Sequence, residues 1–309
     1  MKLIMNVLNF TSILVFLIPV SLLTGSFLPD FLVSTIVIIF IFTSIREQKI
    51  KYFFNTFFFF FTLFYLYIVS ISLLSESIFF SLKSSIFYFR FGIFPLAIWY
   101  LIDNQKNFLR NFTYILLFTF VFALIDGYFQ LFFGENIFGF KSLLSERLTI
   151  TFNDKMVLGV YLARLFPLLF ALIVLHNSNN KDKFFSSPFL ILFLMIATDV
   201  LVYTTGERTA LGLMLITTVL VILLMSKLKL LRILSFIVSI FIILFITFSS
   251  QEIKNRNYDH TVNQLGISPN SEGLNYLSPQ HESHIRSSWK IFLENPIFGS
   301  GPNTFRKLC

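Results

Sequence analysis

The chain has 309 residues, of which 56% are hydrophobic and 13% are charged, and 44 of them are phenylalanine. A soluble core of this length cannot bury so much apolar surface, so the composition excludes a soluble globular protein and predicts an integral membrane protein. The formal net charge is +8. Basic loops beside a membrane account for that charge, and no nucleic-acid-binding motif gives it another use.

Apolar segments recur along the chain, each close to the roughly 20 residues that a helix needs to cross about 30 Å of hydrocarbon. We predict an all-α, polytopic membrane protein with about nine spans. In chain order the spans are Leu3–Leu23, Phe27–Ile45, Tyr52–Leu74, Ile86–Ile102, Phe108–Phe133, Met156–Leu175, Pro188–Tyr203, Thr209–Met225 and Leu230–Phe248. Residues 1–248 are expected to form a transmembrane bundle, and residues 249–309 to begin a large outer loop.

The lysines and arginines of the short connections indicate the orientation, because cytoplasmic loops carry an excess of both residues. With nine spans these residues fall on alternate connections and therefore on one side. They are Lys2, Arg46, Lys49, Lys51, Lys106, Arg110, Lys181, Lys183, Lys227, Lys229 and Arg232. We expect a cytoplasmic N-terminus. The opposite connections are then Gly25–Ser26, Ser75–Ser85, Gly134–Lys155, Thr204–Arg208 and the tail Ser249–Cys309.

One motif places charge at the edge of a span. The sequence Y-T-T-G-E-R-T-A-L-G, from Tyr203 to Gly212, sets Glu207 and Arg208 against the start of an apolar helix. Ionisable groups at that depth are costly and tend to face a polar cavity, where a substrate or counter-ion compensates them.

Four arginines fall near the outer side: Arg90, Arg147, Arg164 and Arg208. A guanidinium group stays charged and matches phosphate oxygens in a bidentate way, so this set predicts an anion site. Asp30, Asp126 and Glu207 are acids that would hold the arginines when the site is empty. The alternative is that each arginine pairs with a nearby acid or reaches towards lipid headgroups.

The outer tail predicts a short amphipathic helix from Ser283, as its cap, to Leu293, ended by Asn295-Pro296. Trp289 would lie at the membrane interface and Arg286 would face the substrate. In the alternative interpretation the helix merely rests on the membrane surface.

Four motifs together resemble one protein family. They are D-G-Y-F-Q-L-F-F-G from Asp126, R-L-T-I-T-F-N-D-K-M-V-L-G-V-Y-L from Arg147, G-E-R-T-A-L-G from Gly206, and the tail sequence R-S-S-W-K-I-F-L-E-N-P-I-F-G-S-G-P-N-T-F from Arg286. They resemble the O-antigen ligase and Wzy-type polymerase superfamily, over roughly Asp126 to Phe305. The resemblance implies an enzyme of the bacterial inner membrane that takes a glycan from undecaprenyl diphosphate at the periplasmic face. The acceptor would be lipid A core for a ligase or another lipid-linked glycan for a polymerase.

The resemblance also implies a mechanism, which is inverting glycosyl transfer without metal or cofactor. Arg208 and Arg286 would be catalytic, and Arg147, Arg164 and Arg90 would bind the diphosphate. The family's histidine motif follows the G-P-N-x-F segment, and the sequence stops before it. His284 or His281 is then the candidate base, and an inactive truncated remnant is an alternative.

A transporter or flippase of an anionic or lipid-linked substrate is an alternative from another class. Transporters usually place their substrate site near the bilayer midplane, between paired repeats. The motifs of this chain cluster at one face, which favours the enzyme.

Overall fold

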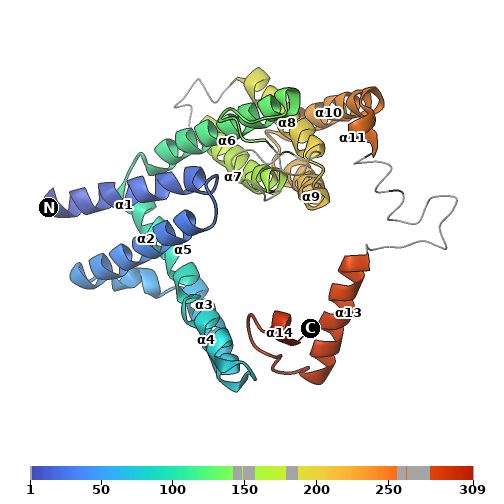
Figure 1. The fold of residues 1–309 in the computed structure, drawn as a ribbon. Coiled ribbons are helices and arrows are strands. Elements are labelled where there is room, and N and C mark those ends of the chain that lie inside the picture. The colour runs from blue at the N-terminus through green and yellow to red at the C-terminus, as the bar shows by residue number, and fades with distance from the viewer. Residues whose placement is uncertain are drawn as a thin grey trace. The chain divides into compact units, whose positions relative to one another are not determined.

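A computed structural model describes residues 2–141, 148, 157–178, 187–255, 262 and 279–308 (Figure 1). The described residues form helices and turns with one isolated bridge between Glu135 and Lys141. The predicted all-α class is confirmed.

Among the described residues up to 249, ten α-helices follow one another. They are α1 Lys2–Ser21, α2 Phe27–Arg46, α3 Thr56–Leu74, α4 Ile78–Ile86, α5 Phe89–Asn104, α6 Phe108–Phe133, α7 Leu158–Ser178, α8 Pro188–Thr204, α9 Arg208–Leu224 and α10 Lys229–Ser249. Shorter elements are the 3-10 helix η1 Ile50–Phe53 and the α-helices α11 Gln251–Lys254 and α14 Phe305–Leu308. The described part of the tail also contains α13 Pro279–Glu294.

Six helical segments of the described residues are long and apolar enough to cross a membrane. Shorter apolar helices occupy Met5–Ser21, Pro188–Thr204 and Arg208–Leu224. All nine predicted segments are therefore helical, although nine membrane crossings remain a prediction. The connection Ser75–Ser85 contains helix α4, which continues towards α5 as one apolar segment, Ile78–Asn104.

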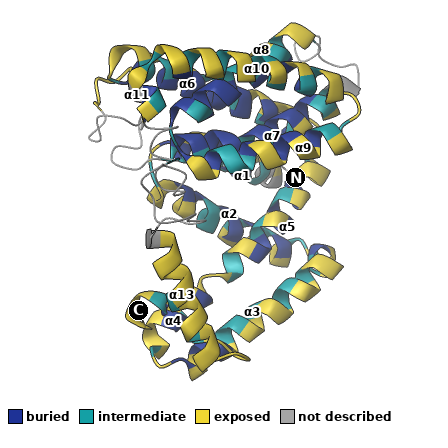
Figure 2. Cartoon of the chain, turned by 90° about the vertical axis from the view of Figure 1, so that its right-hand side faces the viewer, coloured by how far each residue is buried: buried dark blue, intermediate teal, exposed yellow. Residues whose placement is uncertain are grey.

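Figure 2 shows exposed residues along many helices, and many of these residues are large and apolar. In α3, Phe59 and Phe60 are 60% and 63% exposed. A helix satisfies its own backbone hydrogen bonds, so such a face is stable against hydrocarbon. Together these features make the chain a multi-pass membrane protein.

The chain divides into two compact units. Unit 1 comprises Met1–Val15, Pro29–Lys106 and Asn263–Cys309, and unit 2 comprises Phe16–Leu28 and Asn107–Val262. In unit 2, α8 packs along α10 and α7 along α9. Its core includes the fully buried residues Leu116, Phe120, Leu162, Phe166 and Leu201. In unit 1 the core includes Ile36, Phe40, Tyr52 and Leu96.

Two contacts within unit 1 join segments that the charge pattern places on the same side. In unit 1, the Tyr52 hydroxyl donates to Asp103 at 3.0 Å, between two predicted cytoplasmic ends. The Ser75 hydroxyl donates to the carbonyl of Ser300 at 2.8 Å, between two predicted outer segments. These contacts do not distinguish the compartments, so the orientation remains a prediction, as does the division into residues 1–248 and 249–309.

Candidate functional site

The turn between α8 and α9 is fixed by short side chains. The hydroxyl of Thr204 donates to the carbonyl of Leu201 at 2.9 Å, and that of Thr205 to Val202 at 2.7 Å, so both satisfy the last turn of α8. Gly206 follows with a φ of +73°, a conformation that glycine adopts without strain. The reversal brings Glu207 and Arg208 to the start of α9.

The carboxylate of Glu207 binds the first turn of another helix. It accepts hydrogen bonds from the backbone N–H of Gly159 at 2.8 Å and of Val160 at 3.2 Å, at the start of α7. Glu207 is buried, with 8% of its surface exposed. An acid is favourable there because the N–H groups of a first helical turn have no intrahelical partners and carry partial positive charge. Glu207 thus fixes the turn before α9 against α7.

Close packing of the two backbones depends on Gly159. A Cβ atom at this position would lie 2.6 Å from the Thr205 hydroxyl and 3.0 Å from the Cβ of Ala210. Only a residue without a side chain therefore permits this approach.

Arg208 is the first residue of α9, and its side chain is exposed. Glu207 occupies the N-cap position of α9, yet its side chain does not cap that helix. The start of α9 consequently combines a guanidinium group with a helix N-terminus that the side chain of Glu207 does not cap. Both attract anions.

Two other predicted diphosphate ligands, Arg164 and Arg147, fall like Arg208 in the sequence range of unit 2. Arg164 is exposed on α7 in unit 2. Arg147 lies outside the described residues. The expectation that Asp126 holds an arginine is wrong: its Oδ1 accepts from the N–H of Ile137 at 2.8 Å, and its Oδ2 has no partner.

Arg90 belongs to unit 1, where the interpretation as a local ion pair applies. Its guanidinium donates to Asp30 at 2.9 Å and to the Ser34 hydroxyl at 3.2 Å. Asp30 thus holds Arg90, as predicted for one of the acids.

Helix α13 carries the remaining candidates in unit 1. Arg286 pairs with Glu282 at 2.6 Å, one turn away, and its side chain is 81% exposed. His281 and His284 are exposed on the same helix, and the His284 ring centroid lies 6.0 Å from that of Phe305. The predicted helix is present and ends before Asn295, but Ser283 lies inside it and is not its cap, because the helix begins at Pro279. Its apolar side chains Trp289 and Phe292 are exposed, which fits an amphipathic helix.

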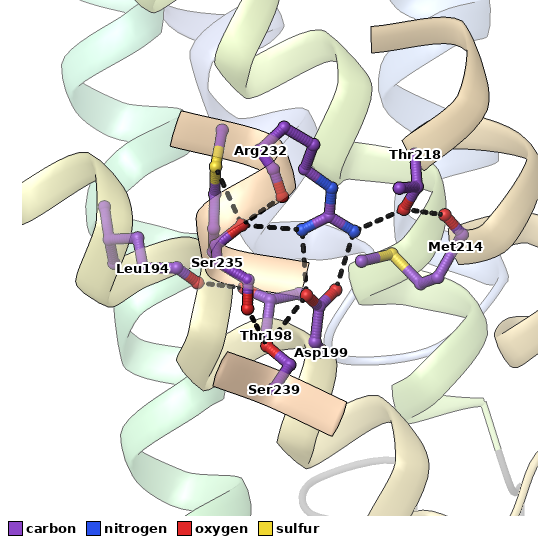
Figure 3. Close-up of polar contacts among 9 residues, drawn as sticks. Leu194, Thr198, Asp199, Met214, Thr218, Arg232, Ser235 and Ser239 are labelled. Carbon is purple, nitrogen blue, oxygen red and sulfur yellow. Dashed lines mark hydrogen bonds and ion pairs between the residues drawn. The ribbon is translucent and has the colours of Figure 1, made fainter. Parts of the chain in front are cut away.

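The most buried charge cluster of the described chain was not predicted (Figure 3). Arg232 of α10 donates to both oxygens of Asp199 of α8, at 2.8 and 2.9 Å. The hydroxyl of Ser239 donates to the same carboxylate at 3.0 Å. Arg232 also donates to Thr218 of α9, and its guanidinium lies 5.0 Å from the ring centroid of Phe166 of α7. Four helices of unit 2 therefore meet at one ion pair.

From the sequence, Arg232 counts among the residues of the basic connections, but the structure places it inside α10 with a fully buried side chain. The sequence does contain a signal for its partner. Asp199 is the one charged residue between Pro188 and Tyr203, and an isolated acid in an apolar span usually has a buried partner. Among the described residues, no group of three histidine, cysteine or acidic side chains is placed to hold a metal ion.

Residues 190–308 match the family model described as O-antigen ligase. This agrees with the resemblance that the sequence motifs indicate. The matched range includes Asp199, Arg208, Arg232 and Arg286. No curated protein and no solved structure matches the chain.

Proposed function

We propose that this multi-pass membrane protein, whose residues 190–308 match the O-antigen ligase family model, transfers a glycan from undecaprenyl diphosphate to an acceptor. The acceptor is lipid A core or another lipid-linked glycan. The reaction takes place at the periplasmic face of the inner membrane.

The start of α9 is the observation on which this proposal chiefly rests. A diphosphate leaving group develops negative charge as its bond to the sugar breaks, and fixed positive groups stabilise that charge. Arg208 supplies a planar fork of donors, and the N-terminus of α9, which the Glu207 side chain does not cap, supplies backbone N–H groups. Glu207 fixes this turn on α7, so the position of Arg208 is set before substrate binds.

The proposed chemistry is one inverting displacement. The acceptor hydroxyl attacks the anomeric carbon, its proton passes to a base, and the bond between that carbon and the diphosphate oxygen breaks. His284 or His281 of α13 is the proposed base, and Arg286 the proposed second catalytic arginine. Arg147, Arg164 and Arg90 are the proposed further ligands of the diphosphate. The charges of the arginines replace those of a metal ion in this scheme.

The test substitutes Arg208 in the chain inserted in membrane vesicles, with a polyprenyl diphosphate-linked glycan as donor. Arg208→Ala should leave the amount of protein in the membrane unchanged and lower the transfer rate about 100- to 1000-fold, the usual effect of removing one donor to a developing anion. Arg208→Lys should also fail largely, because an ammonium group keeps the charge but loses the bidentate geometry.

Two outcomes would contradict the proposal. If the double variant Glu207→Gln/Arg208→Ala regains activity that Arg208→Ala lacks, Arg208 serves Glu207 and not the diphosphate. If the donor crosses the vesicle membrane without transfer to an acceptor, the chain is a transporter.

A further inference from the structure

A cluster of serines marks the connection between α3 and α4 in unit 1. We call residues 72–85 the serine hairpin. Ser72 and Ser85 hydrogen-bond to each other across it, and the hydroxyl of Ser85 also donates to the carbonyl of Ser81 at 2.7 Å. Ser72, Ser81 and Ser85 are buried, and the Ser81 hydroxyl oxygen has no hydrogen-bond partner. Small side chains leave room here for another backbone to approach.

The backbone that approaches belongs to the tail. We call residues 299–304, of sequence G-S-G-P-N-T, the glycine turn. The Ser75 hydroxyl donates to the carbonyl of Ser300 at 2.8 Å. A second contact joins the tail to α4: the Nζ of Lys307 lies 3.6 Å from the ring centroid of Phe80. A cation over an aromatic face is a favourable contact.

Gly301 lies at the point of closest approach. A Cβ atom at this position would lie 2.8 Å from the Ser81 hydroxyl and 2.9 Å from the side chain of Ser75, and its φ is +94°. Glycine is therefore required for two reasons: a Cβ atom would clash with the two serines, and a positive φ is strained for other residues. Gly299 also has a positive φ, +68°, but open space surrounds its Cβ position. The two glycines thus form a matched pair, since only Gly301 touches the serine hairpin.

The glycine turn is connected rigidly to α13. The backbone N–H of Gly299 donates to the carbonyl of Asn295 at 3.0 Å, directly after α13. Thr304 is buried, and its hydroxyl donates to the carbonyl of Gly301 at 2.7 Å. The next residue, Phe305, lies against His284 of α13. Wherever the glycine turn is fixed, α13 is fixed with it.

We propose that the serine hairpin binds the glycine turn and thereby positions α13, with Arg286 and His284, for glycan transfer. Ser75, Ser81 and Gly301 are positioning residues that act through α13. This inference rests on the proposed function. It adds a structural role for the α3–α4 connection, which lies outside the matched O-antigen ligase range.

The first experiment tests the contact itself and needs no substrate. Cysteines replace Ser75 and Ser300 in the full chain with Cys309→Ser, and oxidation in membranes should cross-link them efficiently. A pair at Ser75 and Ser288, which is exposed on α13, serves as the collision control. Adding Gly301→Ala should abolish the cross-link, whereas Gly299→Ala should retain it. If the first pair gives no cross-link, or if all pairs give equal yields, the serine hairpin does not bind the glycine turn.

The second experiment tests positioning by measuring the affinity of the full chain, in lipid nanodiscs, for a polyprenyl diphosphate-linked disaccharide. Gly301→Ala and Arg286→Ala should each weaken binding about 10- to 100-fold, as expected for one lost charge-assisted hydrogen bond, and Gly299→Ala should not. The double variant should be no worse than either single variant, because both remove one interaction.

The outcomes separate the two hypotheses. Binding that Arg208→Ala weakens but Gly301→Ala does not would overturn positioning and leave the proposed function intact. Additive losses in the double variant would overturn action through Arg286. Failure of the unsubstituted chain to bind the probe would overturn the proposed function, and the positioning role with it, even where the cross-link forms.

Discussion

Asp199 and Arg232 lie within apolar helices, where moving either charge out of water costs several kcal/mol. The structure offsets this cost with a bidentate pair at 2.8 and 2.9 Å and with hydroxyl groups from α9 and α10. Such a pair adds little net stability compared with apolar residues of similar volume. We expect the pair to make the helix packing specific instead. Any arrangement of α8, α9 and α10 that separates Asp199 from Arg232 would leave a buried charge without a partner.

Substitutions at this pair should therefore be strongly non-additive. Arg232→Met leaves Asp199 charged and buried without a partner, and should destabilise the protein by about 3–5 kcal/mol, as should Asp199→Leu. The double variant Asp199→Leu/Arg232→Met should recover most of that loss. Thermal unfolding of the purified protein in detergent measures the effect, with the exposed Arg208→Ala as control. If the double variant loses as much stability as the two single variants together, the two charges are not coupled.

At the scale of helices, the start of α7 depends on a residue from the turn between α8 and α9. Two N–H groups of its first turn, those of Gly159 and Val160, donate to Glu207, which precedes α9. The long-range cap and the absent side chain of Gly159 together determine how closely α7 approaches the α8–α9 turn. Because Arg208 follows Glu207 directly, a shift of α7 is expected to displace Arg208 as well.

Two glycine substitutions test this packing. Gly159→Ala puts a methyl group 2.6 Å from the Thr205 hydroxyl, so we expect a loss of about 1–3 kcal/mol from overpacking, together with reduced transfer activity. Gly212 lies inside α9 with open space around its Cβ position. Gly212→Ala should stabilise the protein by about 0.4–1 kcal/mol through lower backbone entropy in the unfolded chain. Unfolding midpoints give both values, and a Gly159→Ala variant as stable as Gly212→Ala would refute the close approach.

For the whole molecule, the arrangement of charge predicts which segments share a side of the membrane. With nine spans, the connection containing Lys183 is cytoplasmic and the tail containing Asn270 is outside. Fusions of alkaline phosphatase after Asn270 should be active, while fusions after Lys183 should be inactive. A β-galactosidase fusion should show the opposite pattern. The same compartment for both positions would refute the topology.

The all-α class and the nine helical segments followed from the sequence, because the apolar runs are long and helices alone satisfy their backbone within a membrane. The G-E-R motif was also recognisable, since charge at the end of an apolar segment is rare and glycine marks the turn. The start of α13 was less predictable. Ser283 is a good N-cap residue by type, yet Pro279 begins the helix, as proline readily does at a first helical position.

The sequence by itself determined the membrane setting, the helical class and the family resemblance, because composition, segment length and short motifs are local properties. Only the tertiary structure decided which charges meet. Asp199 and Arg232 are 33 residues apart, and Glu207 is 48 residues from Gly159. Each of these charged residues has many polar residues within that distance along the chain. The packing of α7, α8, α9 and α10 determines which of them becomes its partner. The same holds for the serine hairpin and the glycine turn, which are 225 residues apart at Ser75 and Ser300. The role of their small residues can be recognised only from the contact between the two segments.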